Sequence, residues 1–581
     1  MILKRLYELA ERERLLDDPA FESVPVPYIV KVGREGEYLG IEERRGEFVR
    51  QMKKGPPKSE PDKGKELLIA KPHGNTAIAG FARYFADTLA RVLPVDDQNK
   101  SVNSRKTFWQ QITKAAADSG DPALKAVASF GIAAGTDGDL AGRIKADLEA
   151  LTPDPGDRCT FAWHPDEGAT ILNREPVRSW WRAFYAQFDE KRQGSGPQGI
   201  CQITGEYGPL ATTHPKLPTI PGGMAAGVCV VSNDKDAFLS YGLDGAANAA
   251  IGYRAAEGYT RALAALIQQK LFRSRIAIGN TLFLFWTRDK CDLNDVYACI
   301  DGTDPDLVAK LLDSMKDGHK ATVLDHNAFY CLSLSGNSAR VVVRDYLEAP
   351  LAEVRANLAA WFADLKIVDA WGKEIVSVFP LWQLALATAL ESDAVSPNLP
   401  PQLMEAALKR QKLPDNVLAA CLRRLSAEGE EGFRATRLGL IKLVLNRKGF
   451  SMSEELDLAC VTPGYVCGRL MAVFERVQWG ALGDVNASIV DRFYGTASTS
   501  PGLVFPRLFK SAEQHLGKLQ GASERWKRDM GENLQKDLES LCSRIKAFPN
   551  LLALSEQGQF ALGFYHQRAA YRKGKGSADK E

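Results

Sequence analysis

The sequence predicts an α+β protein whose mixed N-terminal part, with small antiparallel sheets, is followed by a C-terminal helical bundle. Strand-like apolar runs alternate with helical patterns through the first half of the 581-residue chain. In the last third, apolar residues recur at helical spacing without strand-like runs between them. We place the change from mixed to helical structure between about residues 346 and 375.

Two short strands near the N-terminus, residues 28–32 and 37–41, are predicted to form a hairpin. The glycines between them permit the positive φ values that tight turns need. The basic segment 50–65 follows and contains Gly55-Pro56-Pro57, a composition that resists regular structure. We therefore expect an exposed loop at this segment.

The order of patterns in residues 227–346 is typical of a β-α-β-β-α-β unit, so we consider a ferredoxin-like sheet there. Its first strand, residues 228–231, is short and apolar, and the helix that follows carries an apolar stripe over residues 259–271. The remaining elements are a hairpin, a second helix and two strands, at residues 275–286, 305–315, 329–334 and 340–346.

Amphipathic helical patterns fill the C-terminal part, for example over residues 505–519 and 530–545. Helices of this kind bury their apolar stripes against one another, so a bundle is expected. The chain is thus divided into a mixed N-terminal domain, an α+β subdomain, a helical connecting region and the bundle, at residues 1–226, 227–346, 347–451 and 452–581.

The composition excludes several classes of protein. Apolar residues make up 45% and charged residues 25%, which rules out a disordered, collagen-like or disulfide-scaffold chain. Lys plus Arg number 74 against 72 Asp plus Glu, so any nucleic-acid surface must come from the local distribution of charge. The ten cysteines form no CxxC pair, and no signal peptide or membrane span is evident, so we expect a reduced, cytoplasmic protein without a membrane partner.

The sequence contains no recognisable catalytic motif. Its seven histidines and ten cysteines have neither HExxH nor zinc-ligand spacing. The glycine-rich segment 221–227 precedes a strand instead of opening a helix, and no Walker or dinucleotide motif occurs. We therefore expect no catalytic residue, no metal and no cofactor, and a protein that is not an enzyme.

Three polar patches with glycine and aromatic residues are candidates for contact with nucleic acid. They lie at residues 71–76, 202–216 and 232–259. The alternatives are an ordinary turn, a solvated loop and partly buried core, in that order. The candidate residues are Lys71, Gly74 and Asn75 in the first patch, Gln202 in the second, and Asn233, Tyr241, Asn248 and Arg254 in the third.

Separated motifs along nearly the whole chain resemble one family. They are VSN (231–233), AFLSYG (237–242), LSLSGNSARVVVR (332–344), GRLMAVFERVQ (468–478), DRFYG (491–495) and QGQFALGFYHQ (557–567). In this order they resemble the large subunit of the type I-C CRISPR interference complex, Cascade.

The resemblance implies a non-catalytic protein that works with CRISPR RNA and with the backbone and guide-end-binding subunits of the complex. Such a protein finds a short motif beside the target in double-stranded DNA, helps to open the duplex, and supports a recruited helicase-nuclease. We expect RNA or subunit contacts from the third patch. The expected DNA contacts are Lys53 and Lys54 as phosphate holders, Lys71, Gly74 and Asn75 in a reading loop, and Gln202 as a wedge or contact.

The resemblance also implies that the C-terminal part is made separately, as a small subunit of the complex from the same gene. Met452 opens this part, and Arg447-Lys448-Gly449 can be encoded by purine-rich codons of ribosome-binding character. Within the bundle, the candidates for holding a displaced DNA strand are Arg469, Arg476 and Arg492, with surface ion pairs as the alternative.

Two other functions stay open at this point. One is a metal-dependent nuclease whose ligands are scattered too widely for a sequence pattern, and the other is a protein-only assembly factor. Metal-dependent cutting of DNA by the isolated protein would favour the first. DNA discrimination that survives loss of residues 71–75 would favour the second.

Overall fold

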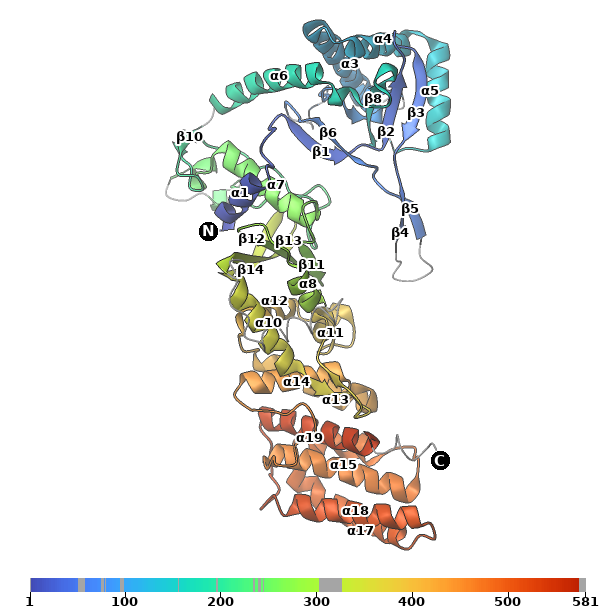
Figure 1. Ribbon diagram of the computed structural model, residues 1–581, viewed down its shortest axis with the longest axis vertical. Helices are drawn as coiled ribbons and strands as arrows, with labels where there is room; N and C mark the ends of the chain where they lie inside the picture. Colours follow the sequence, from blue (N-terminus) through green and yellow to red (C-terminus); the bar gives the residue numbers. More distant parts are fainter. Residues whose placement is uncertain are drawn as a thin grey trace. The chain divides into compact units, whose positions relative to one another are not determined.

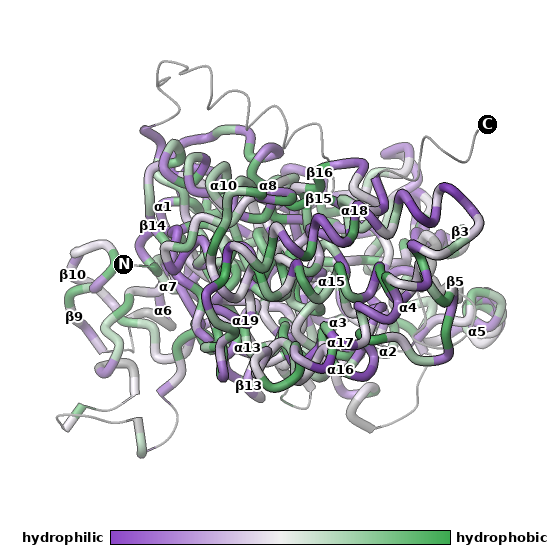
Figure 2. The backbone as a smooth tube through the Cα atoms, turned by 90° about the horizontal axis from the view of Figure 1, so that it is seen from below, coloured by the Kyte–Doolittle hydropathy of each residue, from purple (hydrophilic) through white to green (hydrophobic). Residues whose placement is uncertain are grey.

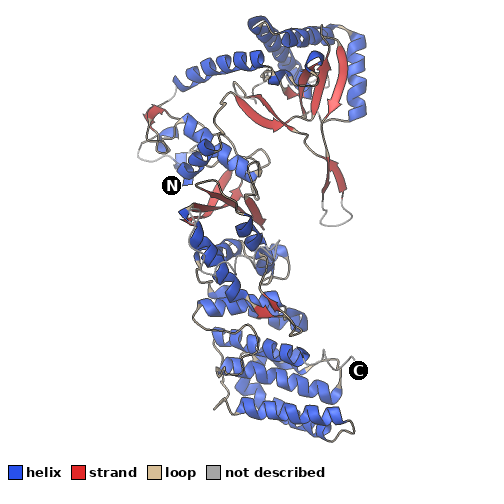
Figure 3. Cartoon of the chain, in the orientation of Figure 1, coloured by secondary structure: helices blue, strands red, loops and turns tan. Residues whose placement is uncertain are grey.

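The computed structural model describes residues 2–50, 58–74, 78, 80–94, 99–154, 156–194, 197–233, 236–238, 242–243, 245–301 and 326–573. The chain forms two compact units. The N-terminal unit consists of Leu6–His214 and Asn233–Arg261, and the C-terminal unit consists of Met1–Arg5, Pro215–Ser232 and Ala262–Glu581. The predicted α+β class is confirmed, since strands occur in both units and, among the described residues, only helices follow β16 (Ile375–Val376) (Figure 3).

The main sheet of the N-terminal unit has the strand order β3-β2-β8-β7. These strands span Tyr38–Glu43, Tyr28–Val32, Arg158–Trp163 and Asp87–Thr88. β2 pairs antiparallel with β3, so the predicted hairpin is confirmed. β2 also pairs with β8, in parallel, with Tyr28 opposite Cys159. Parallel strands need a long crossover, so this pair joins segments that no local sequence pattern connects.

Three helices pack on this sheet and on one another (Figure 1). They are α3 (Asn99–Ser119), α4 (Pro122–Thr136) and α5 (Gly138–Leu151). α4 begins after Asp121, whose carboxylate accepts the N–H groups of Ala123 and Leu124. Gly36, in the β2–β3 turn, has a φ of +107°, and a Cβ there would lie 2.8 Å from the Ala126 carbonyl of α4. The close contact between turn and helix therefore requires glycine.

Two further strand pairs complete the first part of this unit. β1 (Phe21–Pro25) pairs with β6 (Glu66–Ala70), and β4 (Glu47–Arg50) pairs with β5 (Lys58–Pro61). The expectation of an irregular loop over residues 50–65 is therefore wrong at its ends. Asp62 closes the base of the β4–β5 ribbon, because its Oδ1 accepts the N–H of Gly46 at 2.9 Å and that of Gly64 at 2.7 Å. Lys53 and Lys54 lie outside the described residues.

The sheet of the C-terminal unit has the order β11-β12-β13-β14, and all its pairs are antiparallel. The strands span Arg275–Ile278, Thr281–Thr287, Ala328–Asn337 and Arg340–Pro350. β12 lies between two neighbours and is buried along its whole length, which explains its unbroken apolar sequence. α8 (Asn294–Asp301) contributes to the core on this sheet.

The ferredoxin-like interpretation is wrong for the strands that the structure describes. In that fold the first strand is central, whereas residues 228–231 make only isolated bridges, Val228 with Leu217 and Cys229 with Arg340. Neighbouring strands of the sheet are instead consecutive along the chain. Of residues 228–231 only Val228 is buried, and the other three are partly exposed, so the apolar run indicated neither a fully buried segment nor strand pairing. The helix predicted at residues 305–315 lies outside the described residues.

Helices form the rest of the C-terminal unit. A first group comprises α10 (Leu351–Leu365), α11 (Leu381–Leu386), α12 (Leu399–Lys409), α13 (Asp415–Glu428) and α14 (Ala435–Arg447), with the short hairpin β15 (Ile367–Val368) and β16. The C-terminal bundle comprises α15 (Pro463–Leu482), α16 (Ile489–Ala497), α17 (Pro501–Gln520), α18 (Arg525–Cys542) and α19 (Leu554–Lys573). Polar and apolar segments alternate along these helices (Figure 2). Across the described ranges, no helix has both the length and the apolar character to span a membrane.

α15 and α19 pack closely against each other in the bundle. A Cβ at Gly468 would overlap the backbone of Phe560, and one at Gly563 would overlap the backbone of Tyr465. The two helices can therefore approach only because each has glycine at the contact. The motifs at residues 468–478 and 557–567 are thus largely packing motifs of the core.

Candidate nucleic-acid interface

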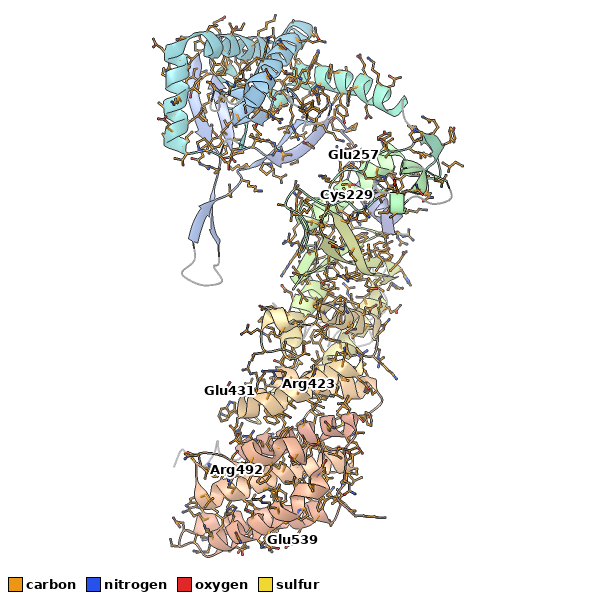
Figure 4. The ribbon with its side chains drawn as sticks, turned by 180° about the vertical axis from the view of Figure 1, so that it is seen from behind. Cys229, Glu257, Arg423, Glu431, Arg492 and Glu539 are labelled. Carbon is orange, nitrogen blue, oxygen red and sulfur yellow. The ribbon has the colours of Figure 1, made fainter. Side chains whose placement is uncertain are left out.

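Lys71 directly follows β6, and its side chain is only 18% exposed because it forms an ion pair with Glu257 of α7 (Tyr253–Ile267). Arg261, one turn further along α7, approaches the same carboxylate to 2.6 Å. Arg261 also donates to the carbonyls of Leu15 at 2.7 Å and Phe21 at 2.9 Å. Figure 4 labels Glu257, the residue that joins the two cations.

Burial and the ion pair shift the pKa of both Lys71 and Glu257. Burial lowers the pKa of Lys71, and the Glu257 carboxylate opposes this change. Burial would raise the pKa of Glu257, but the positive charges of Lys71 and Arg261 outweigh it and lower that pKa. Lys71 therefore anchors the start of the predicted reading loop instead of presenting its ammonium to a phosphate, which corrects its expected role as a DNA contact.

His73 provides a second anchor for this loop. Its ring lies among aromatic side chains, with centroids 5.1 Å from Tyr84, 5.3 Å from Phe81 and 5.9 Å from Phe184. Burial lowers the pKa of His73, so the ring is neutral at pH 7. Gly74, the next residue, is exposed, and Asn75 lies outside the described residues.

Sequence reasoning missed Glu257 and His73 as loop anchors. Glu257 lies 186 residues from Lys71, and no local pattern links the two positions. His73 stands in a polar loop sequence, whereas its aromatic neighbours come mainly from α6 (Glu175–Gly194) and from residues 81–84. The signal in the sequence was the aromatic stripe of α6, which predicts that a partner side chain packs there.

The structure brings part of the second and third predicted patches together. β9 (Gln198–Ile200) and β10 (Tyr207–Pro209) form a short hairpin, and Leu210 makes a bridge with Gly252, just before α7. Gln202 is exposed in the hairpin loop, and its N–H donates to the Ala250 carbonyl at 2.8 Å. The expected role of Gln202 as a contact is thus compatible with its exposure.

A pocket of about 180 Å³ lies between this hairpin and the start of α7. Its walls come from residues 201–209 and 252–255. The Tyr207 ring is 74% exposed, and the Arg254 side chain is 67% exposed. Arg254 donates to the Tyr7 hydroxyl at 3.3 Å, and this hydrogen bond raises the pKa of Arg254. An exposed ring and a fixed guanidinium at one pocket suit contact with a nucleotide.

The other residues of the third patch are placed differently. Asn248 ends a 3₁₀ turn, and its side-chain amide donates to the Leu243 carbonyl at 2.8 Å, so it stabilises local backbone. Asn233 is partly buried, and Tyr241 lies outside the described residues. Of the four residues expected to contact RNA or a subunit, Arg254 is therefore the one that the structure places at a pocket.

The three bundle arginines lie in different environments. Arg469 is buried, with 6% of its surface exposed, and its Nε donates to Gln567 at 2.9 Å. Burial lowers the pKa of Arg469 and of Arg476, and the Arg476 guanidinium lies 4.4 Å from the Trp479 ring centroid. Only Arg492 is exposed. Arg469 is thus a core residue and not a strand contact.

A row of exposed cations on α17 was missed by sequence reasoning. Arg507, Lys510 and Lys518 are exposed and, at spacings of three and eight residues, follow one face of the helix, while Glu513 is the only carboxylate within α17. The Arg507 guanidinium lies 5.3 Å from the centroid of the Phe493 ring. Phe493 follows Arg492 in the sequence of α16. We call Arg492, Arg507, Lys510 and Lys518 the α16–α17 basic row. The sequence could have predicted this row from the positive charges that recur on the polar side of the helical pattern at residues 501–520.

Within the described ranges, no group of three or more His, Cys, Asp or Glu side chains is arranged to hold a metal ion. The expectation that the protein is not an enzyme stays a prediction.

A family model described as CRISPR-associated protein (Cas_Csd1) matches residues 3–572. The chain belongs to the Cas_Csd1 family. Membership makes it a CRISPR-associated protein of the Cascade type, which acts with other CRISPR-associated proteins and RNA. No curated protein matches the chain.

Proposed function

We propose that this Cas_Csd1 protein is the non-catalytic large subunit of a type I-C Cascade complex. In this proposal it binds CRISPR RNA and target double-stranded DNA, recognises a short motif beside the target, helps to unwind the duplex, and supports a recruited helicase-nuclease. The observation that carries the proposal is the α16–α17 basic row, because its four exposed cations outnumber the two carboxylates of these helices, Asp491 and Glu513, and suit a phosphate backbone.

The N-terminal unit supplies the motif reader in this proposal. Lys71 and His73 anchor the start of the loop, and Gly74 and Asn75, which follow in the sequence, contact the duplex. Glycine suits close approach of the backbone to a groove, and the asparagine amide reads base edges. Lys53 and Lys54, between β4 and β5, hold phosphates, and Gln202 is a further contact.

The bundle supplies the strand holder. Pairing with the guide offsets the cost of separating the target duplex nearly one for one, so a modest grip on the displaced strand favours the open state. The α16–α17 basic row provides that grip, in place of Arg469 and the half-buried Arg476. A separate product that begins at Met452 carries the same row as a small subunit.

The row is tested by the salt dependence of single-strand binding. We expect the triple variant Arg507→Gln, Lys510→Gln, Lys518→Gln to bind a 20-nucleotide single-stranded DNA more weakly than the wild-type chain. Each lost phosphate contact reduces the slope of log affinity against log salt by about 0.7, so the slope should fall by about 2. Fluorescence anisotropy of the full-length protein at several salt concentrations gives both values.

The matched control changes three other exposed cations of the bundle, Arg525, Lys536 and Lys546, to glutamine. Its net charge equals that of the test variant. A slope that falls equally in both variants would mean that net charge, and not the row, controls binding. An unchanged slope in the test variant would refute the strand-holding role.

A further inference from the structure

The pocket beside α7 is built from two segments that hydrogen bonds hold together. The Gln202 N–H donates to the Ala250 carbonyl at 2.8 Å, and the Ala211 N–H donates to the Ile251 carbonyl at 2.8 Å. Gly205 has a φ of +79° and lies in the tight turn between β9 and β10. Its N–H donates to the Cys201 carbonyl at 2.8 Å and closes this turn. The walls are thus fixed before any ligand arrives.

Several hydrogen-bond donors surround the Cys201 thiol at this pocket. Burial would raise the pKa of the Cys201 thiol, but hydrogen bonds from the Thr204 hydroxyl and from the N–H groups of Gly252, Thr204 and Ile203 outweigh it and lower that pKa. α7 begins at Tyr253 beside them, and the first turn of a helix leaves N–H groups without intrahelical acceptors. The Arg254 guanidinium lies at the same pocket, with the Glu11 carboxylate 3.9 Å away. Because this ion pair is long and the Arg254 side chain is 67% exposed, the guanidinium and the first turn of α7 remain able to contact a phosphate.

Tyr207 offers a surface for a flat ring at the same pocket. Tyr207 is 74% exposed on the hairpin, so one of the largest side chains of this unit spends most of its area in water. Such exposure of an aromatic ring beside a cation is typical of a stacking platform for a base. Glu206 also lines the pocket and attracts Arg254. Its carboxylate disfavours a free phosphate ion and accepts hydrogen bonds from the amino groups of a base.

We propose that this pocket binds a single unstacked nucleotide of a nucleic-acid strand. The base stacks on Tyr207, and the adjoining phosphate contacts Arg254 and the first turn of α7. At about 180 Å³ the pocket is smaller than the roughly 300–1,000 Å³ of sites for drug-sized ligands, so it admits one base and not a stacked pair. The inference rests on the proposed function in one respect, namely that the chain binds nucleic acid.

The test uses the full-length protein and fluorescein-labelled 12-nucleotide single strands, one of RNA and one of DNA with the same sequence. We expect Tyr207→Ala and Arg254→Gln each to weaken binding roughly 10-fold. Tyr207→Phe keeps the ring and should stay within about 2-fold of the wild-type protein. The controls are Ile200→Ala, an exposed apolar residue of the same hairpin, and Arg34→Gln, an exposed arginine of the same unit.

A second readout locates the nucleotide. Strands that contain one 4-thio-substituted pyrimidine should crosslink on irradiation to the peptide that contains Tyr207, and the yield should fall in Arg254→Gln. The strand that binds and crosslinks better, RNA or DNA, identifies the source of the nucleotide. If the wild-type protein binds both strands but Tyr207→Ala and Arg254→Gln match their controls, the pocket inference is overturned and the proposed function stands. If the wild-type protein binds neither strand, both fail.

Discussion

Lys71, Glu257 and Arg261 form a charged network inside the N-terminal unit, with the Lys71 and Glu257 side chains 18% and 17% exposed. Removal of one partner from such a pair leaves a poorly solvated charge, which costs far more than loss of a surface ion pair. Lys71 thus holds the loop in position by stabilising the fold of this unit. If Lys71 contacted a phosphate, it would instead increase the affinity for DNA.

We expect Lys71→Ala to lower the free energy of unfolding of this unit by about 2 kcal/mol, since Glu257 loses one of its two cationic partners and keeps Arg261 at 2.6 Å. The double variant Lys71→Met, Glu257→Met removes this pair but also takes the carboxylate from Arg261, which keeps its bonds to the Leu15 and Phe21 carbonyls, so it should recover part of that loss. Urea unfolding measures both values. Lys31→Ala, which breaks the exposed pair with Glu42 at 2.8 Å, is the control and should cost less than about 1 kcal/mol.

DNA affinity of the assembled complex separates the two roles of Lys71. If the folded double variant binds target DNA as the wild-type complex does, Lys71 is an anchor. If it recovers stability and still loses affinity, Lys71 touches DNA and its assignment as an anchor alone is wrong.

Local patterns in the sequence predicted these residues only in part. Lys71 follows the strand β6, and Arg469 lies on a helix of the predicted bundle. Burial, however, depends on what packs from elsewhere: Glu257 in the first case and Gln567 in the second. Helical spacing could have indicated the row on α17, because its residues are near neighbours in sequence.

At the scale of elements, the C-terminal bundle packs against helices that precede Met452 in the sequence. A Cβ at Gly558 of α19 would contact Leu418 of α13 and Leu445 of α14 at 3.3 Å, and the Phe564 ring lies 4.8 Å from that of Phe433. A product that begins at Met452 lacks these partners and exposes the apolar side of α19. We therefore expect it to be found in a complex and not as a free monomer.

Synonymous codon changes at Arg447, Lys448 and Gly449 test the internal start. We expect the short polypeptide that co-purifies with the complex to disappear while the full-length chain keeps its level. Synonymous changes at codons 435–437, further upstream, should leave the short polypeptide unchanged. Its persistence after the changes at 447–449 would show that these codons do not direct a start at Met452.

Elements were predicted well where one segment determines its own structure. The β2–β3 hairpin and the helices α17 and α18 all follow from spacing and turn residues. The parallel β2–β8 pair and the β4–β5 ribbon do not, because strand pairing depends on partners that periodicity cannot identify.

For the whole molecule, each compact unit is built from separated stretches of chain. A division into contiguous segments cannot describe this, since the chain leaves a unit and returns to it. The family match covers residues 3–572 and therefore includes both units. In the proposed function the two units have separate tasks: motif reading with the pocket beside α7 in one, and strand holding by the α16–α17 basic row in the other.

The most direct test compares guide-loaded complexes assembled with and without the full-length chain, incubated with target duplex and Mg²⁺ but no helicase-nuclease. Permanganate footprinting reports unpaired thymines, and gel electrophoresis reports strand breaks. We expect unpaired thymines to appear beside the motif only when the chain is present, and the DNA to stay intact. Equal opening without the chain, or cleavage that a single carboxylate substitution in this chain abolishes, would contradict the proposed function.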